Sequence, residues 1–245
     1  MKHLSNFTPA ETLLLLEGNA VKLKDLLRAT LLDLLMRQVL QTTELERLFH
    51  EKEKPTTDIY VVRGPNFHQH KPLAHEAIFL SPFLENEQAK IFFKSLVRAA
   101  YDNAKNESHY GKLILKSDTL QPYFAQGILK IFNGKFSLTQ DGETMQQEIR
   151  SEIKTLEKEL LHLMESDQAR ALEILTMIKG NTFLIKGVDL KTMKEIESHL
   201  VSASNSRTVT SSFPDTLTWL ALTHTSSFDG NYGDDWGAGG DFDID

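Results

Sequence analysis

The sequence predicts a mainly α-helical protein with small β-hairpins, built from tandem winged-helix-like modules and a long helix. Leucine-rich segments with helical spacing occupy residues 1–40, and an Asn-Gly turn signal lies between two apolar runs near residue 133. Apolar residues also recur every three or four positions from Met145 to Leu163. Helical periodicity interrupted by hairpin signals favours this class. The 245 residues are enough for one to three modest domains.

A capping box marks the first predicted helix. Thr8 is the expected N-cap, Pro9 takes the first helical position, and Glu11 lies three residues after the cap, where its carboxylate can reach the Thr8 amide. Gly18 follows a run of leucines and is expected to end the helix. This segment therefore predicts a short helix before Gly18.

A second helix and a hairpin complete the first predicted module, residues 1–66. The leucines of 22–38 recur at helical spacing, which predicts a helix there. Strand-like runs at 45–49 and 59–62 flank a polar stretch and are expected to pair as a hairpin. Two helices followed by a hairpin form the outline of a winged helix, in which one more helix is usual.

The second predicted module, residues 67–142, contains the clearest local signal. Asn133 and Gly134 lie between the apolar runs 128–132 and 135–138, and both tolerate the positive φ of a type I′ turn. Helices followed by this hairpin predict another winged-helix-like module. The helical patterns before it cover 73–84, with an interruption at Pro82, then 87–105 and 109–126.

A helical region is expected over 143–201. Its long helix is predicted to run from 139 to 165, with an apolar seam that is close to a heptad repeat. The seam can pack on the protein's own core, which we favour, or on a second copy in a homodimer. Three shorter segments follow: a helix over 167–179, a strand-like piece over 182–186 and a last helix over 189–200.

The negative charge belongs to the C-terminal part of the chain. The formal net charge is −7, from 27 basic and 34 acidic residues, yet no base follows Arg207 and seven aspartates do. Residues 1–207 are therefore neutral. Residues 202–245 are predicted to be a Ser-rich linker and a disordered acidic-aromatic tail, because this composition cannot bury enough apolar surface to fold alone.

Several classes of function lose support from what the sequence lacks. It has no Cys, which excludes thiolate chemistry and Cys-based metal sites. It has no Gly-rich phosphate loop, no GxSxG motif, no signal-peptide-like start and no apolar run that could span a bilayer. We therefore expect a cytoplasmic protein that is not an enzyme, without a catalytic residue or cofactor. The neutral body argues against a generic basic nucleic-acid binder.

Three of the nine histidines lie close together in the sequence. His68, His70 and His75 lie beside Glu76, and imidazole and carboxylate groups can bind zinc or nickel. The spacing is not HExxH, and Lys71 would repel a cation. A polar connector between the modules is the favoured alternative, so we assign no metal and keep these histidines only as candidates.

Lysines near the second predicted hairpin form a candidate nucleic-acid face. A winged helix that binds DNA uses its helices and its wing, which here would supply Lys112, Lys116, Lys130 and Lys135. Acidic residues interrupt the same region, so a solvated mixed face is the favoured alternative. Winged helices also dock proteins, and the fold class does not decide between these partners.

The tail combines aromatic anchors with acids, which makes it the candidate partner-docking segment. Disordered tails of this kind can add to a sheet edge or fill a groove on a basic partner. A solubilising tail is the favoured alternative, although exposed aromatics work against solubility. Calcium binding is less favoured, because one imperfect repeat cannot form a stacked roll. The candidate docking residues are Phe228, Tyr232, Trp236, Asp241, Phe242, Asp243 and Ile244.

Short motifs resemble two families. The segment 8–11, the break at Gly18 and the leucine-rich 29–35 look like the soluble winged-helix-like region of a group of uncharacterised bacterial membrane proteins with Gly-rich ends. Residues 138–142 are similar to their second module, and the likeness covers roughly residues 5–200. The order of Leu-rich helices around a Gly break is also similar to the Golgi phosphoprotein family, which implies binding to phosphoinositide headgroups. Neither resemblance implies a catalytic residue.

The sequence favours a cytoplasmic adaptor or scaffold that docks a protein partner through its winged-helix-like modules and its tail. One alternative is a winged-helix DNA-binding regulator whose acidic tail competes for its basic face. The other is a peripheral protein that binds phosphoinositides or anionic lipids, which the neutral body disfavours. Nucleic acid is the less favoured partner, and membrane association stays undecided.

Overall fold

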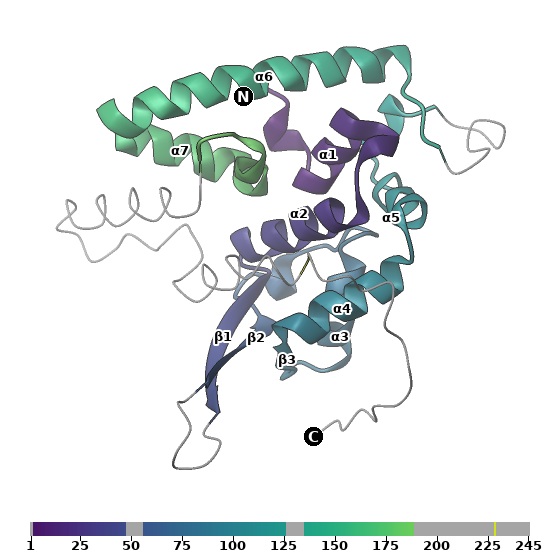
Figure 1. The fold of residues 1–245 in the computed structure, drawn as a ribbon, viewed down its shortest axis with the longest axis vertical. Coiled ribbons are helices and arrows are strands. Elements are labelled where there is room, and N and C mark those ends of the chain that lie inside the picture. Colours follow the sequence, from purple (N-terminus) through teal and green to yellow (C-terminus); the bar gives the residue numbers. More distant parts are fainter. Residues whose placement is uncertain (1, 48–55, 126–134, 189–227, 229–245) are drawn as a thin grey trace.

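The computed structural model describes residues 2–47, 56–125, 135–188 and 228 (Figure 1). It confirms a mainly helical fold with a small antiparallel sheet. The strands are β1 Leu40–Arg47, β2 Thr56–Arg63 and β3 Ile91–Phe92. The α-helices are α1 Pro9–Glu17, α2 Leu23–Met36, α3 Ala77–Glu85, α4 Phe93–Ala104, α5 Glu107–Ile114, α6 Gln140–Ser166 and α7 Gln168–Ile178.

The helices form layers above the sheet. Figure 1 shows α6 across one end of the molecule, with α7 folded back beside it and α1 beneath it. Helix α2 crosses the middle, and α3 and α4 lie beside the sheet at the opposite end. Strands β1 and β2 extend away from the helices as a two-stranded ribbon (Figure 1). Because α2 is covered on both sides, it is the most buried of these helices, with eleven of its 14 residues buried.

The predicted capping box at the start of α1 is confirmed. The Glu11 amide donates to the Thr8 hydroxyl at 3.3 Å, and the Thr8 amide donates to the Glu11 carboxylate at 2.6 Å. Gly18 ends the helix with a φ of 56°, a left-handed conformation that favours glycine. These local signals place α1 correctly because the helix ends satisfy their own backbone groups.

The first hairpin is confirmed, but its bounds differ from the prediction. Strand β1 begins at Leu40, which pairs with Arg63, rather than near residue 45. The strand order β1-β2-β3 leaves β1 at an edge of the sheet. Strand β3 was not predicted: the helix expected from 87 begins at Phe93, because Ile91 and Phe92 pair with β2 instead.

Three other predicted elements need correction. Helix α3 continues through Pro82 without the expected interruption. Helix α5 ends at Ile114 rather than near 126. The strand predicted over 182–186 is wrong, because Lys179–Leu184 forms a 3-10 helix, η7. Side-chain hydrogen bonds to the backbone hold this 3-10 helix in place. In one of them the side-chain nitrogen of Asn181 donates to the Leu4 carbonyl oxygen at 2.8 Å.

The second predicted hairpin lies mostly outside the described residues, as do the helix expected over 189–200 and most of 202–245. The base of the hairpin is described. Phe124 and Leu138 form an antiparallel bridge, and the Ala125 amide donates to the Ser137 carbonyl oxygen at 2.8 Å. The long helix after it is confirmed, with Thr139 as its N-cap.

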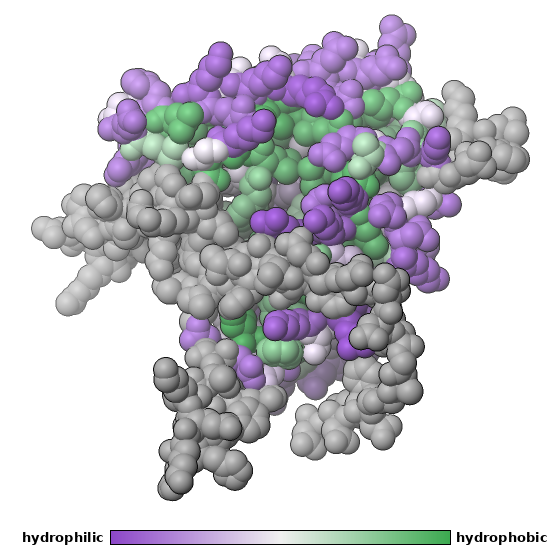
Figure 2. Space-filling model, in the orientation of Figure 1, coloured by the Kyte–Doolittle hydropathy of each residue, from purple (hydrophilic) through white to green (hydrophobic). Residues whose placement is uncertain are grey.

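One hydrophobic core cluster joins residues from Leu4 to Val188, together with Phe228. In α6 the seam residues Ile149, Leu156 and Leu160 are buried in this cluster, so the long helix packs on the protein's own core, as favoured. Figure 2 shows the hydrophilic residues of α6 on its outer side and hydrophobic residues towards the body. The homodimer and the boundaries at 66 and 142 stay predictions.

Candidate functional site

One residue of the predicted tail, Phe228, lies on the folded body. It is 4% exposed, and its ring centroid lies 6.4 Å from that of Tyr101 on α4. The Tyr101 hydroxyl donates a hydrogen bond of 3.0 Å to the Phe228 carbonyl oxygen. A ring contact and a backbone bond therefore anchor the start of the acidic segment at a defined point on α4.

Helix α4 presents cations beside this anchor point. Residues three and four apart are neighbours on a helix surface, so Lys94, Arg98 and Tyr101 lie along one side of α4, and Lys105 is the residue that caps its C-terminal end. We call these four residues the basic flank; the exposed Asp102 is the acid beside it. The three cationic residues are exposed and Tyr101 is half-buried. The flank adjoins the face of α4 that enters the core, which consists of Phe93, Leu96, Val97, Ala100 and Ala104.

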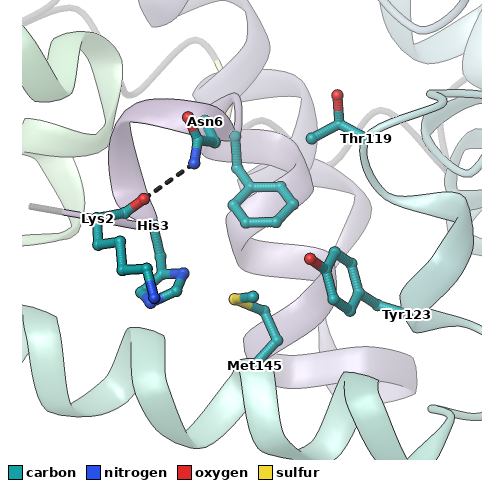
Figure 3. A pocket seen from close by; sticks show the side chains of 7 residues that line it. Lys2, His3, Asn6, Thr119, Tyr123 and Met145 are labelled. Atoms are coloured by element: carbon teal, nitrogen blue, oxygen red, sulfur yellow. Dashed lines mark hydrogen bonds between the residues drawn. The ribbon is translucent and has the colours of Figure 1, made fainter.

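A cavity of about 520 Å³ lies between the N-terminal segment, the 3-10 turn Gln121–Tyr123 and α6 (Figure 3). The rings of Phe7 and Tyr123 meet edge to face within it, with centroids 5.8 Å apart. The wall of the cavity is therefore partly aromatic and otherwise mostly polar. Its lining consists of Lys2, His3, Asn6, Phe7, Thr119, Tyr123 and Met145.

The polar groups of this cavity mainly fasten the N-terminal segment. The Asn6 side chain donates to the Lys2 carbonyl oxygen at 2.9 Å (Figure 3). The His3 imidazole lies 3.4 Å from a Glu148 oxygen, and the His3 amide donates to the Glu152 carboxylate at 3.0 Å. The two His3 contacts tie residues far apart in sequence, and the polar groups do not converge on the cavity as catalytic groups would.

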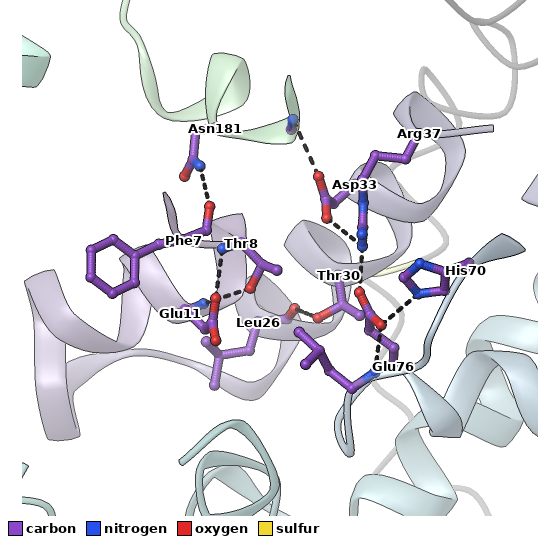
Figure 4. A network of polar contacts seen from close by, with 12 residues as sticks. Phe7, Thr8, Glu11, Leu26, Thr30, Asp33, Arg37, His70, Glu76 and Asn181 are labelled. Atoms are coloured by element: carbon purple, nitrogen blue, oxygen red, sulfur yellow. Dashed lines mark hydrogen bonds and ion pairs between the residues drawn. The ribbon is translucent and has the colours of Figure 1, made fainter. Parts of the chain in front are cut away.

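A buried ionic network joins α2 to the connector that precedes α3 (Figure 4). The Arg37 guanidinium bonds to both Asp33, at 2.8 Å, and Glu76. Glu76 also accepts from the Leu73 amide at 2.7 Å and lies 2.8 Å from the His70 imidazole nitrogen. Asp33 and Glu76 are 3% and 1% exposed, so the network replaces water as their partner.

The pKa values of this network follow from burial and its partners. Burial raises the pKa of Asp33, and the Arg37 charge opposes this only in part. Burial also works against ionised Glu76, but the His70 hydrogen bond, the Arg37 charge and the Leu73 amide lower its pKa to about 2. Burial lowers the pKa of Arg37, but the two carboxylates outweigh it and the pKa is raised. The network therefore favours the charged forms of Glu76 and Arg37 inside the protein.

His75 lies beside the network as a neutral, buried imidazole. It is 1% exposed, its ring meets Tyr110 at a centroid distance of 6.3 Å, and neither ring nitrogen has a hydrogen-bond partner in the described part of the chain. Burial lowers the pKa of His75 to about 4, although the Glu76 charge opposes the shift. Tyr110, next to it, donates to the Thr30 hydroxyl at 2.9 Å.

His75 makes the fold sensitive to acid. Between about pH 6.5 and 4 the unfolded chain binds a proton at this residue that the folded chain does not accept. The stability that neutral His75 contributes is therefore complete above pH 6.5 and is lost as the pH drops, by on the order of 3 kcal/mol, while the raised pKa of Asp33 acts in the opposite direction. Urea unfolding at several pH values from 7 to 4 measures this loss.

Two substitutions control this prediction. His75→Leu removes the titrating group without removing a hydrogen bond, so the stability of this variant is expected to fall much less on acidification. His68→Leu changes an exposed histidine of the same connector and keeps the loss. An equal acid response in both variants would contradict the role assigned to His75.

The three candidate metal ligands do not form a metal site. His68 is exposed beside Phe67, His70 is paired with Glu76, and His75 points to Tyr110. Among the described residues, no group of three His, Cys, Asp or Glu side chains is placed to hold an ion. The connector alternative describes this segment better, because its polar groups link α2 to α3.

The candidate nucleic-acid residues are only partly visible. Lys112 on α5, Lys116 after α5 and Lys135 are exposed, and Lys130 lies outside the described residues. The Phe136 ring packs directly against Gly111, which brings the segment after Lys135 onto α5 beside Lys112. The structure therefore brings together the surroundings of two of the four lysines.

The sequence missed the buried network. Asp33 and Arg37 stand four residues apart at the end of α2 and lie off the apolar stripe of its sequence pattern, yet Asp33 is buried. A signal was present, because an acid and a base at this spacing inside a leucine-rich helix can neutralise each other. Of the candidate docking residues, Phe228 lies on α4, and Tyr232, Trp236, Asp241, Phe242, Asp243 and Ile244 lie outside the described residues.

The chain matches no family model, no curated protein and no solved structure. Both resemblances noted from the sequence therefore stay predictions. Within residues 2–47, 56–125 and 135–188, none of the helices combines the length and the apolar character needed to cross a membrane.

Proposed function

We propose that the protein is a non-enzymatic adaptor that docks a protein partner through its acidic-aromatic tail. The observation that carries this proposal is the burial of Phe228 against Tyr101. It is itself a case in which an aromatic residue of this tail binds a folded helical surface. It also gives the tail a defined starting point on α4, so the remaining anchors are presented from a fixed place.

The body would serve as the rigid carrier, formed by tandem winged-helix-like modules. Helices α1 and α2 followed by the β1–β2 hairpin support the first module. Helices α4 and α5 followed by the bridge between Phe124 and Leu138 support the second. Strand β1 lies at an edge of the sheet in the described part of the chain, and an edge strand is a surface that a partner strand can extend.

The tail sequence defines the chemistry of the partner. After Phe228 the chain contains six aspartates and no Lys or Arg, with Tyr232, Trp236 and Phe242 spaced between them. Such a segment matches a protein surface that offers Lys or Arg around apolar grooves. The aromatic rings would supply affinity on burial, and the aspartates would select a basic surface.

Two variants of the full chain test the adaptor function. Tyr232→Ser, Trp236→Ser and Phe242→Ser together remove the anchors and keep the charge, while replacing the aspartates after Phe228 with Asn keeps the anchors. Affinity purification with quantitative mass spectrometry is expected to show the same partner depleted about tenfold or more with the first variant. The second variant is expected to weaken binding and its salt dependence.

The matched control for these variants is Leu84→Ser, which removes a large hydrophobic side chain that is 57% exposed on α3. This control is expected to retain the partner. If the partner set is unchanged by both tail variants, the tail does not dock the partner and the proposal fails.

DNA binding by the second module is the second candidate, because Phe136 packs on α5 beside Lys112. Nucleic acid extracted from the same purifications separates the two functions. Bound DNA that is lost with Lys112→Glu and Lys135→Glu would favour the regulator, whereas eluates without nucleic acid favour the adaptor.

A further inference from the structure

We propose that the basic flank of α4 is a binding site for an acidic-aromatic peptide, and that its occupant is this chain's own tail, residues 229–245. The proposal concerns contacts within one chain. It therefore holds or fails independently of whether the tail also docks a partner.

The first argument is that the tail already touches this site. Tyr101 belongs to the basic flank, and it makes both the ring contact and the hydrogen bond to Phe228. The bond goes to the carbonyl oxygen of Phe228, so Tyr101 holds the backbone at the point where Asp229 begins. The first acid of the tail thus starts next to a helix surface rich in cations.

The second argument is charge complementarity. Lys94, Arg98 and Lys105 are exposed along the flank, and the segment after Phe228 contains aspartates as its only charged side chains. Attraction between exposed charges is weak for one pair but adds up when several pairs share an anchored chain. Anchoring at Phe228 raises the effective concentration of the tail at the flank, so even modest contacts are populated.

The third argument is reach. The flank extends from Lys94 on α4 to the C-cap Lys105, and these eleven steps along a helix correspond to roughly 17 Å. Trp236 follows Phe228 by eight residues, which span up to about 28 Å when extended. The part of the tail up to Trp236, with Asp229, Asp234 and Asp235, is therefore long enough to cover the flank in either direction.

The consequence is a flank that the tail covers in the resting protein. While the tail is bound, other polyanions are kept from Lys94, Arg98 and Lys105, and the tail aromatics are kept from other surfaces. A second acidic-aromatic peptide, or a basic partner that takes the tail, would open this contact. The flank and the tail would then become accessible together.

The absence of Cys makes the contact directly measurable in the full chain. Asn103→Cys, on an exposed position of α4 away from the flank, and Ala238→Cys in the tail provide the two labelling positions for a fluorescence energy transfer pair. The pair must have a transfer distance shorter than the reach of the ten residues from Phe228 to Ala238; high transfer is then expected at low salt, and a fall of about twofold or more is expected at 1 M salt, where the Debye length is about 3 Å.

Charge reversal identifies the surface. Lys94→Glu with Lys105→Glu is expected to lower the transfer about twofold or more at low salt. Lys154→Glu with Lys158→Glu, two exposed lysines on α6, is the matched control and is expected to leave it unchanged. Circular dichroism and thermal unfolding verify that both variants are folded. Tyr101→Phe removes the hydroxyl donor to Phe228 and is expected to give an intermediate fall.

Three outcomes would overturn the proposal. The first is equal transfer in the flank variant and the α6 control. The second is low transfer in the unsubstituted chain at low salt. The third is transfer that depends on protein concentration. The last result would assign the site to the tail of a second copy. Loss of a partner in affinity purification with unchanged energy transfer would support only the adaptor function, and the reverse result would support only the contact within the chain.

Discussion

Replacing Arg37 with Met is expected to destabilise the fold by about 3–5 kcal/mol. The guanidinium bonds to Asp33 and Glu76, which are 3% and 1% exposed. Without it, two carboxylates stay buried with no cation between them, and the cost of removing one partner of a buried pair far exceeds the net value of the pair. Urea unfolding followed by circular dichroism at pH 7 measures the change.

The matched control for this substitution is Arg28→Met on the same helix. Arg28 is exposed, so its replacement is expected to change the free energy of unfolding by less than about 0.5 kcal/mol. Lower pH adds a second test. Loss of Arg37 raises the pKa of both carboxylates, so the penalty is expected to shrink as they become protonated. Equal effects of the two substitutions at pH 7, or a penalty that does not change with pH, would show that the network does not stabilise the fold.

Replacing Gly64 with Ala is expected to destabilise the fold by about 3 kcal/mol. A Cβ at this position would collide with the Gln38 carbonyl oxygen and would lie 2.7 Å from its carbonyl carbon. These are backbone atoms at the base of the β1–β2 hairpin, where the Gly64 amide also donates to the Val39 carbonyl oxygen at 2.9 Å. Relief of the clash therefore requires the backbone segments at Gly64 and at Gln38 to separate, which breaks this hydrogen bond.

Gly111→Ala is the control for Gly64. Its Cβ would meet only the outer atoms of the Phe136 ring, which can rotate away, and alanine is the better helix former. We expect a change within about 1 kcal/mol. Hydrogen exchange of the β1–β2 amides separates the two variants further, because only Gly64→Ala is expected to speed exchange in that hairpin. Unchanged protection in Gly64→Ala would contradict the close approach seen here.

Elements with complete local signals could be predicted from the sequence, and those that depend on a distant partner could not. The start of α1 was correct because Thr8 and Glu11 satisfy each other's backbone groups within one turn. Strand β3 was not predicted, because the helical pattern of the residues that follow also includes Ile91 and Phe92. These two residues form a strand only because they pair with β2. The apolar run at 182–186 suggested a strand, but no neighbouring strand meets it within the described residues, and η7 packs against α2 instead.

The candidate site divides in the same way. The aromatic-acidic composition of the tail was evident from the sequence, because it depends only on which residues follow Arg207. That Phe228 meets Tyr101 could not be predicted, since the two residues are 127 positions apart and no local pattern links them. The basic flank likewise was not evident, because Lys94, Arg98 and Lys105 are interspersed with acids such as Asp102 and Glu107 in the sequence, and the structure places Phe228 beside them.

By itself, the sequence determined the helical class, the capped start of α1, the long helix and the separation of a neutral body from an acidic segment. These features depend on residue spacing and composition within short stretches, which the chain carries whatever its tertiary structure. Only the tertiary structure decided that Asp33, Arg37 and Glu76 are joined in one buried network and that Phe228 returns to α4. Both results require segments distant in sequence to exclude water together, and that burial is a property of the packed molecule alone.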